Sequence, residues 1–160
     1  MQRISLDRLA ILFASSPALV EANVKLGLKK GAVKVRDDAT KKFGHYQPQV
    51  GSFEAWAVLA TSTVQAKLRA GSAGDDPLIG HYTGKAQNSV WSTPLHNTIE
   101  YEVSGLMAQV GTQDPVGLWQ EYGTSRGIPP RPFLRPALWE NTDYIKSEIG
   151  AAMAEVFRAL

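Results

Sequence analysis

One short run of residues matches a pattern that hydrolases use. Gly123-Thr124-Ser125-Arg126-Gly127 fits the Gly-x-Ser-x-Gly pattern of a nucleophile elbow. Such an elbow needs a strand before the serine, a helix after it and a later histidine as the general base. Here a helical pattern precedes Ser125, Pro129 and Pro130 follow it, and the last histidine, His96, comes earlier in the chain. We therefore interpret the run as a glycine-bounded turn without a catalytic residue.

The remaining polar residues give little indication of metal binding or redox chemistry. The three histidines lack the short spacing of metal-ligand pairs. The two pairs of adjacent acidic residues come without a phosphate-binding glycine loop. The absence of cysteine excludes disulfides, thiolate nucleophiles and cysteine-ligated metals. We expect no enzymatic activity, no cofactor and no bound metal. The three histidines and two acidic pairs considered for metal binding are His45, His81, His96, Asp37, Asp38, Asp75 and Asp76.

Positive charge is concentrated in one part of the chain. The net charge is only +2, but residues 17–44 contain seven Lys and Arg against three Asp and Glu. On a helix these basic side chains fall on two flanks and could neutralise phosphates without reading a base sequence. The alternatives are an acidic protein partner or an ordinary solvated helix face. The candidate contacts are Lys25, Lys29, Lys30, Lys34 and Arg36.

The elements that position these residues follow from length and periodicity. A chain of 160 residues with 44% hydrophobic and 20% charged residues predicts one folded domain, 1–160. A long basic amphipathic helix is predicted over 17–43, with Gly44 as its stop. Gly27 and Gly31 within this helix suggest a bend or the close approach of another backbone. No stretch approaches the ~20 apolar residues of a membrane span, and the N-terminus resembles a signal peptide only faintly.

The second half of the chain predicts a small sheet and a closing helix. Residues 54–70 fit a second helix, whole or broken near Thr61, and 71–77 fit a flexible loop. Alternation on both sides of a polar break predicts an antiparallel hairpin over 99–110. A short helical turn should end at Tyr122, and an amphipathic helix should cover 137–160. The fold class is then α+β, with a long N-terminal helix and a C-terminal helix packed on a small antiparallel β-sheet.

Residues 123–136 combine a glycine turn with a proline- and arginine-rich arm. Prolines hold the backbone extended, and arginine and aromatic side chains are enriched at interface hot spots. The composition therefore predicts a rigid docking arm, and an ordinary loop leading into the last helix is the alternative. The predicted subunit or partner interface consists of Trp119, Tyr122, Arg131, Phe133 and Arg135.

Two stretches of the chain carry a resemblance to a known family. Gln120–Thr124, followed by Pro130–Leu138 before a C-terminal helix, resembles the neck and tail-completion proteins of tailed bacteriophages, which include head–tail joining and minor tail components. Trp56–Gly71, followed by the Thr83-Gly84 pair, is similar to a stretch of those families and of phage virion morphogenesis proteins. The two matches cover the chain from about Trp56 onward, and residues 85–90 depart from the family pattern.

The resemblance implies a non-catalytic structural protein of the virion, assembled in the host cytoplasm and located at the head–tail junction. Copies would form a ring around the DNA channel, as a hexamer or dodecamer, with two complementary surfaces on each subunit. Its neighbours would be head-completion or portal-side proteins and tail-tube or tail-terminator proteins. A DNA-binding accessory protein that uses the basic helix is the alternative. We expect alanine at both Phe133 and Arg135 to leave a folded monomer that cannot assemble.

Overall fold

The computed structural model of the chain describes residues 17–69 and 95–159, together with positions 7, 10, 11, 14 and 77. Apart from Pro77, the predicted flexible loop 71–77 lies outside the described residues. The same holds for His81, for the Thr83-Gly84 pair and for the departure at 85–90.

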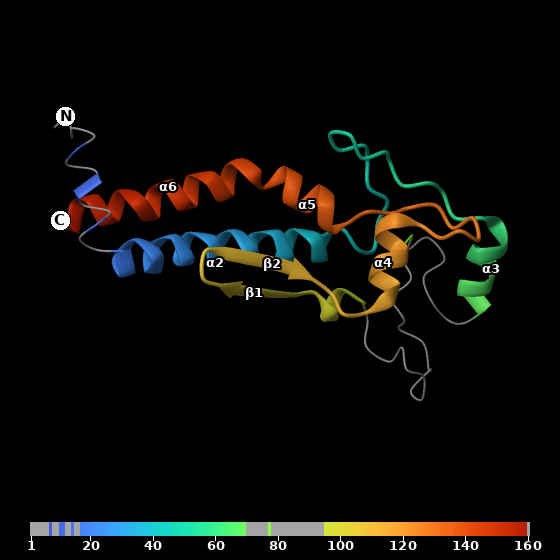
Figure 1. Ribbon diagram of the computed structural model, residues 1–160. Coiled ribbons are helices and arrows are strands. Elements are labelled where there is room, and N and C mark those ends of the chain that lie inside the picture. Colours follow the sequence, from blue (N-terminus) through green and yellow to red (C-terminus); the bar gives the residue numbers. More distant parts are fainter. Residues whose placement is uncertain are drawn as a thin grey trace.

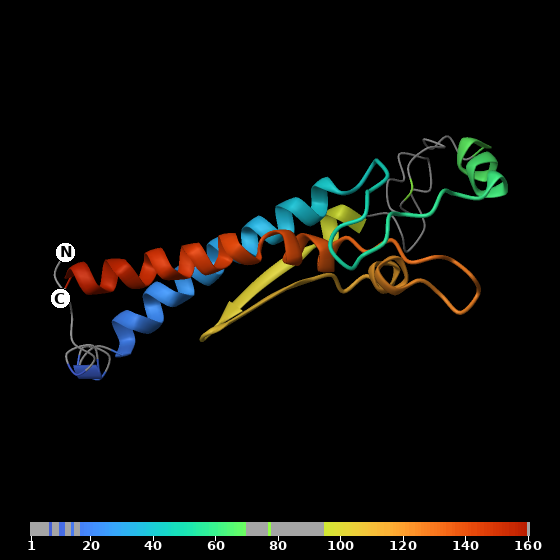
Figure 2. The same cartoon turned by 90° about the horizontal axis from the view of Figure 1, so that it is seen from above.

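The long helix α2 (Pro17–Lys41) organises the fold, as the sequence predicts for 17–43. Helix α6 (Thr142–Ala159) runs antiparallel beside it, and a β-hairpin packs against another of its flanks (Figure 1). The two helices extend together past the tip of the hairpin (Figure 2). The predicted α+β class is confirmed, because both terminal helices and a small antiparallel sheet form the domain.

The predicted hairpin is formed by β1 (Glu100–Ser104) and β2 (Met107–Gly111). The strands are antiparallel, with Ser104 opposite Met107. Gly105 has φ +55° at the first central position of the turn, which is where a type II′ turn prefers glycine. Exposure alternates along both strands, so every second side chain faces α2 while the carboxylates of β1 face away from it.

The remaining elements correct two predicted boundaries. Within the described residues 54–69, only α3 (Thr61–Arg69) is helical. The predicted helix 137–160 is two helices, because α5 (Leu134–Glu140) ends at Asn141 before α6 begins. Helix α5 starts earlier than predicted, since Pro136 lies in its first turn, where a helix does not need the missing N–H. A 3₁₀ turn (Leu95–Thr98) and α4 (Pro115–Tyr122) flank the hairpin.

The hydrophobic core lies where the C-terminal end of α2 meets α4 and α5. The rings of Phe43 and Phe133 pack edge to face, with centroids 5.1 Å apart. Trp56 enters this core from the extended segment before α3, and its Nε1 donates a hydrogen bond to the carbonyl oxygen of Pro132 at 3.0 Å. The buried members of the core are Val35, Ala39, Phe43, Trp56, Leu95, Ile99, Val116, Phe133 and Ala137.

The predicted close approach of another backbone is confirmed at Gly27, whereas at Gly31 the close neighbour is a side chain. A Cβ atom on Gly27 would lie 2.9 Å from the Cα of Ile149 and 3.0 Å from the carbonyl oxygen of Glu148. A Cβ atom on Gly31 would lie 2.9 Å from Cγ1 of Ile145. Helix α6 therefore packs directly on the backbone of α2 at both positions.

Alanine at Gly27 should destabilise the protein although alanine is the better helix former. Alanine gains about 1 kcal/mol of helix propensity, but an overpacked contact typically costs about 1–3 kcal/mol. The cost should prevail because the atoms in the way belong to the α6 backbone. Urea unfolding checks this, with Gly31→Ala as the comparison, since the side chain of Ile145 can move aside. A more stable Gly27→Ala protein would contradict this packing.

Candidate functional site

The segment that carries the family resemblance is folded around the carboxylate of Glu121. This residue is only 4% exposed. Its two carboxylate oxygens accept hydrogen bonds from the backbone N–H groups of Phe133, Leu134 and Arg135, at 2.8, 3.1 and 2.9 Å. These N–H groups open helix α5, and Phe133 provides no side-chain cap of its own. Glu121 therefore caps α5 from α4, where a negative charge also favours the helix dipole.

Arg135 fixes the same junction from the other side. Its Nε lies 3.0 Å from Oε1 of Glu121, and its Nη2 donates to the backbone oxygen of Glu121 at 2.7 Å. The guanidinium carbon lies 4.4 Å from the ring centroid of Tyr122 and 5.4 Å from that of Phe53. Arg135 is half-buried by these contacts and links α4, α5 and the loop after α2.

The proline-rich part of the segment is held inside the domain. The backbone N–H of Arg131 donates to the carbonyl oxygen of Gln120 at 2.6 Å, and its Nη2 donates to that of Ala57 at 2.9 Å. Burial lowers the pKa of the Arg131 guanidinium. Among the described residues, Nε of Arg131 has no hydrogen-bond partner. Together with the bond from Trp56 to Pro132, these contacts tie 131–133 to α4 and to 56–57.

Two of the five predicted interface residues are therefore corrected. Phe133 is 0% exposed and Arg131 is 4% exposed, so neither can form an exposed docking surface. The segment is not an extended arm, because it folds back on Trp56 and becomes helical at Leu134. The physical reason is that an aromatic ring and a long arginine stem gain as much from burial in a core as at an interface.

The glycine-bounded turn predicted at 123–127 is confirmed. Gly123 ends α4 with φ +75°, and a Cβ atom there would lie 2.6 Å from the carbonyl oxygen of Ile128. The turn is closed by a hydrogen bond from the N–H of Thr124 to that same oxygen at 3.0 Å. Ser125 is exposed at its tip and follows a helix, so the strand of a nucleophile elbow is missing from this segment.

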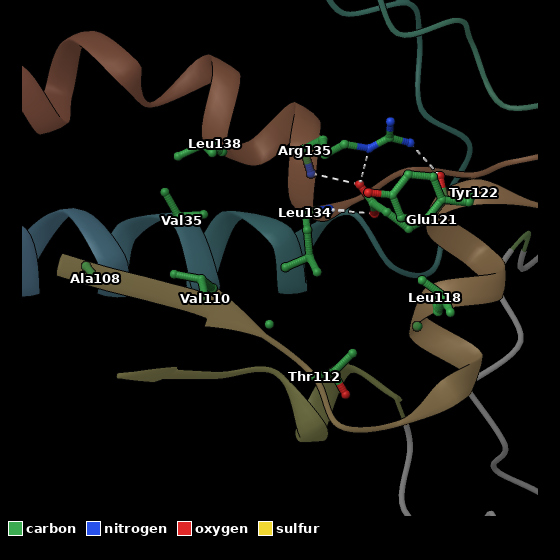
Figure 3. Close-up of a pocket in the computed structure, with 12 residues that line it drawn as sticks. Val35, Ala108, Val110, Thr112, Leu118, Glu121, Tyr122, Leu134, Arg135 and Leu138 are labelled. Atoms are coloured by element: carbon green, nitrogen blue, oxygen red, sulfur yellow. Dashed lines mark hydrogen bonds and ion pairs between the residues drawn. The ribbon is translucent and has the colours of Figure 1, made fainter. Parts of the chain in front are cut away.

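An apolar groove of about 380 Å³ opens between β2, α4 and α5 (Figure 3). Val110 and Leu134 form part of its floor and also pack against the hydrophobic core. Leu118 and Tyr122 lie at its rim and are 60% and 62% exposed. The core is thus open to solvent on this side. The groove is lined by Val35, Ala108, Val110, Gly111, Thr112, Gly117, Leu118, Glu121, Tyr122, Leu134, Arg135 and Leu138.

Two of the surviving interface candidates, Tyr122 and Arg135, line this groove, whereas Trp119 does not. Trp119 and Tyr122 are exposed on α4, as the prediction requires, and Arg135 is half-buried at one end of the groove. The sequence reasoning missed Leu118 and Leu138, which are exposed beside it. A signal for Leu118 was present, because a leucine next to Trp119 on a short helix cannot share a single buried face with it.

Most of the predicted basic contacts are neutralised within the chain. Hydrogen bonding to Glu148 raises the pKa of Lys30, and hydrogen bonding to Asp38 raises that of Lys34. Lys25 and Lys29 are exposed and form no ion pair with a described residue. The pairs within the chain are Lys30–Glu148 at 2.9 Å, Lys34–Asp38 at 2.6 Å and Arg36–Asp37 at 2.7 Å.

Asp38 connects this charged flank to the junction of α5 and α6. Burial alone would raise the pKa of Asp38, but hydrogen bonds from Lys34, Asn141 and Lys41 outweigh it and lower the pKa to about 2. The amide of Asn141 donates to Asp38 at 3.0 Å and to the carbonyl oxygen of Ala137 at 2.8 Å. The break between α5 and α6 is therefore anchored on α2.

Comparisons of the chain with protein-family models, curated proteins and solved structures each found no match. Over the part of the chain that the structure describes, no helix is long and apolar enough to cross a membrane. The same residues contain no group of three or more acidic or histidine side chains that could hold a metal ion. The features that bear on function are the groove, the charges and the resemblance of residues 120–138.

Proposed function

We propose that this protein is a non-catalytic structural subunit of a tailed-bacteriophage virion that acts at the head–tail interface, in the neck or in tail completion. Copies of the chain form a ring around the DNA channel and contact head-side and tail-side proteins. The observation that carries the proposal is the apolar groove between β2, α4 and α5, with large exposed side chains at its rim.

The groove has the properties of a protein-binding surface. A concave apolar patch with polar groups beside it can mark a site of protein–protein contact. An aromatic side chain and an arginine at such a patch are the types that dominate binding energy, and here these are Tyr122 and Arg135. The patch is also rigid, because Glu121 holds α4 and α5 in one arrangement. A preorganised surface loses less entropy on binding.

The residues of 120–138 that carry the family resemblance shape the groove. Glu121, Gly123 and Arg135 build the junction that presents the groove, while Arg131 and Phe133 hold it against the core. A chain that keeps these residues keeps the shape of the groove. The resemblance to neck and tail-completion proteins therefore supports a shared way of presenting a binding surface.

Sequence-independent DNA binding is the second candidate, and Lys25 and Lys29 favour it. Both are exposed on one flank of α2 without an ion pair to a described residue. Lys30, Lys34 and Arg36 are less suited to it, because each already has a carboxylate partner. In a ring, the two free lysines could face the DNA in the channel, so the two functions are compatible.

A charge placed at the groove rim should break assembly without unfolding the subunit. Leu118→Asp changes an exposed side chain, and a disrupted hot spot costs about 2 kcal/mol or more, which is roughly a 30-fold weaker association. Native mass spectrometry and electron microscopy should find rings for the unchanged protein and monomers for this variant. The matched control is Leu68→Asp on α3, because Leu68 is equally exposed, at 60%, and does not line the groove.

Two results would count against the ring. One is an unchanged protein that remains monomeric over a wide range of concentrations. The other is normal assembly of Leu118→Asp. Tight, strongly salt-dependent DNA binding by the monomer, abolished by Lys25→Glu with Lys29→Glu, would favour the accessory DNA-binding protein.

A further inference from the structure

The β-hairpin leaves both of its outer edges unpaired within the described residues. The sheet there consists of β1 and β2 alone. An isolated two-stranded hairpin is only marginally stable in water, and a free strand edge is a template for pairing with another chain. Helix α2 covers one face of this hairpin, and no backbone hydrogen bond joins α2 to either strand.

The register identifies which backbone groups are free. Ser104 and Met107 flank the tight turn and form a hydrogen-bonded pair. Pairs alternate along an antiparallel ladder, so every second residue directs its N–H and C=O away from the partner strand. No other backbone hydrogen bond between described residues reaches these groups. The outward-directed residues are Tyr101 and Val103 on β1 and Ala108 and Val110 on β2.

The two edges have different surroundings. The free edge of β2 runs along the apolar groove, which Ala108 and Val110 help to line (Figure 3). The free edge of β1 lies on the opposite side of the hairpin, on the flank where the guanidinium of Arg36 lies 5.1 Å from the ring centroid of Tyr101. The apolar groove therefore lies beside the free edge of β2.

We propose that neighbouring copies in the ring join by pairing the β1 edge of one copy with the β2 edge of the next, along the groove. This inference rests on the proposed ring. The occupant is a second copy because each chain carries both edges, and β1 and β2 are matched in length, with five residues each. Joining one surface to a different surface is a heterologous contact, which closes into a ring where the rotation between neighbours brings the last copy back to the first.

The side-chain pattern of β1 fits the place beside β2. Its half-buried residues, Tyr101 and Val103, point to the helix-covered face, which is also the face of Val110. Glu100 and Glu102 point to the other face and would remain in water. Adding β1 of a neighbour therefore extends the apolar face of the sheet toward α4 and α5 and buries no carboxylate.

Proline at an outward-directed position tests the pairing. Ala108→Pro removes an N–H from the β2 edge, and Val103→Pro removes one from the β1 edge, while the hydrogen bonds inside the hairpin remain. Each variant alone should be a folded monomer by circular dichroism and native mass spectrometry, where the unchanged protein forms rings. Ala108→Ser and Val103→Thr are the matched controls, because they keep the N–H and should still form rings.

Mixing the two proline variants gives the decisive result. Ala108→Pro keeps an intact β1 edge, and Val103→Pro keeps an intact β2 edge, so an equal mixture should form a complex of two chains and no ring. Normal rings of Ala108→Pro alone would overturn the edge pairing and leave the ring function standing. Self-association of Val103→Pro alone would also overturn it, because the contact would then join two β2 edges. Failure of the unchanged protein to form any ring would overturn both proposals.

Discussion

Glutamine in place of Glu121 should lower the free energy of unfolding by roughly 2–3 kcal/mol, because buried backbone N–H groups lose a charged hydrogen-bond acceptor. The carboxylate accepts three backbone N–H groups and pairs with Arg135. An amide has only one accepting oxygen, and its NH₂ group would face N–H donors instead of acceptors. Since a whole domain is stable by only about 5–15 kcal/mol, this single change should remove a sizeable share of the stability.

Urea unfolding followed by circular dichroism measures this loss. The matched control is Glu155→Gln, which makes the same chemical change at an exposed ion pair with Arg158. Exposed pairs contribute about 0–1 kcal/mol, so the control should unfold near the midpoint of the unchanged protein. Equal midpoints for Glu121→Gln and Glu155→Gln would show that the Glu121 contacts do not hold α4 to α5.

Truncating Phe133 to alanine should cost about 3–5 kcal/mol, as for other buried phenylalanines. The ring is fully buried and packs edge to face on Phe43. This result would differ from the one predicted from sequence alone, in which the doubly substituted chain stays folded and fails only to assemble. Here the loss of assembly should follow from the loss of the fold.

Thermal unfolding separates these two results. Leu138→Ala is the comparison, because Leu138 is exposed beside the same groove and its truncation should change stability by less than about 0.5 kcal/mol. Phe133→Ala should unfold at a clearly lower temperature, while Leu138→Ala should keep the unfolding temperature and lose assembly. A stable, folded Phe133→Ala monomer would instead support the docking arm predicted from the sequence.

The elements that the sequence predicted correctly are those with local causes. The apolar spacing of α2, the alternation of the hairpin and the glycines at 123 and 127 act over a few neighbouring residues. The close packing predicted at Gly27 and Gly31 also has a local signal, because glycine inside a helix is costly unless it has a packing role.

The features that the sequence could not show depend on distant partners. Glu121 bonds to N–H groups between 12 and 14 residues further along, and Lys30 finds its carboxylate 118 residues away. The spacing of apolar and polar residues along the chain does not reveal such long-range pairs. Composition also could not show that Arg131 and Phe133 are buried, because the same large side chains are enriched in cores and at interfaces.

The burial of α2 differs along its length, and this divides the helix into two parts with different local stability. Its fully buried residues begin at Gly27 and continue to Ala39, whereas none lies between Pro17 and Leu26. The part from Gly27 onward can open only when the core opens, but the first turns can fray and re-form while the rest stays folded. Backbone amides there should exchange with solvent early, so this end of the helix pair is where a subunit can change shape at little energetic cost.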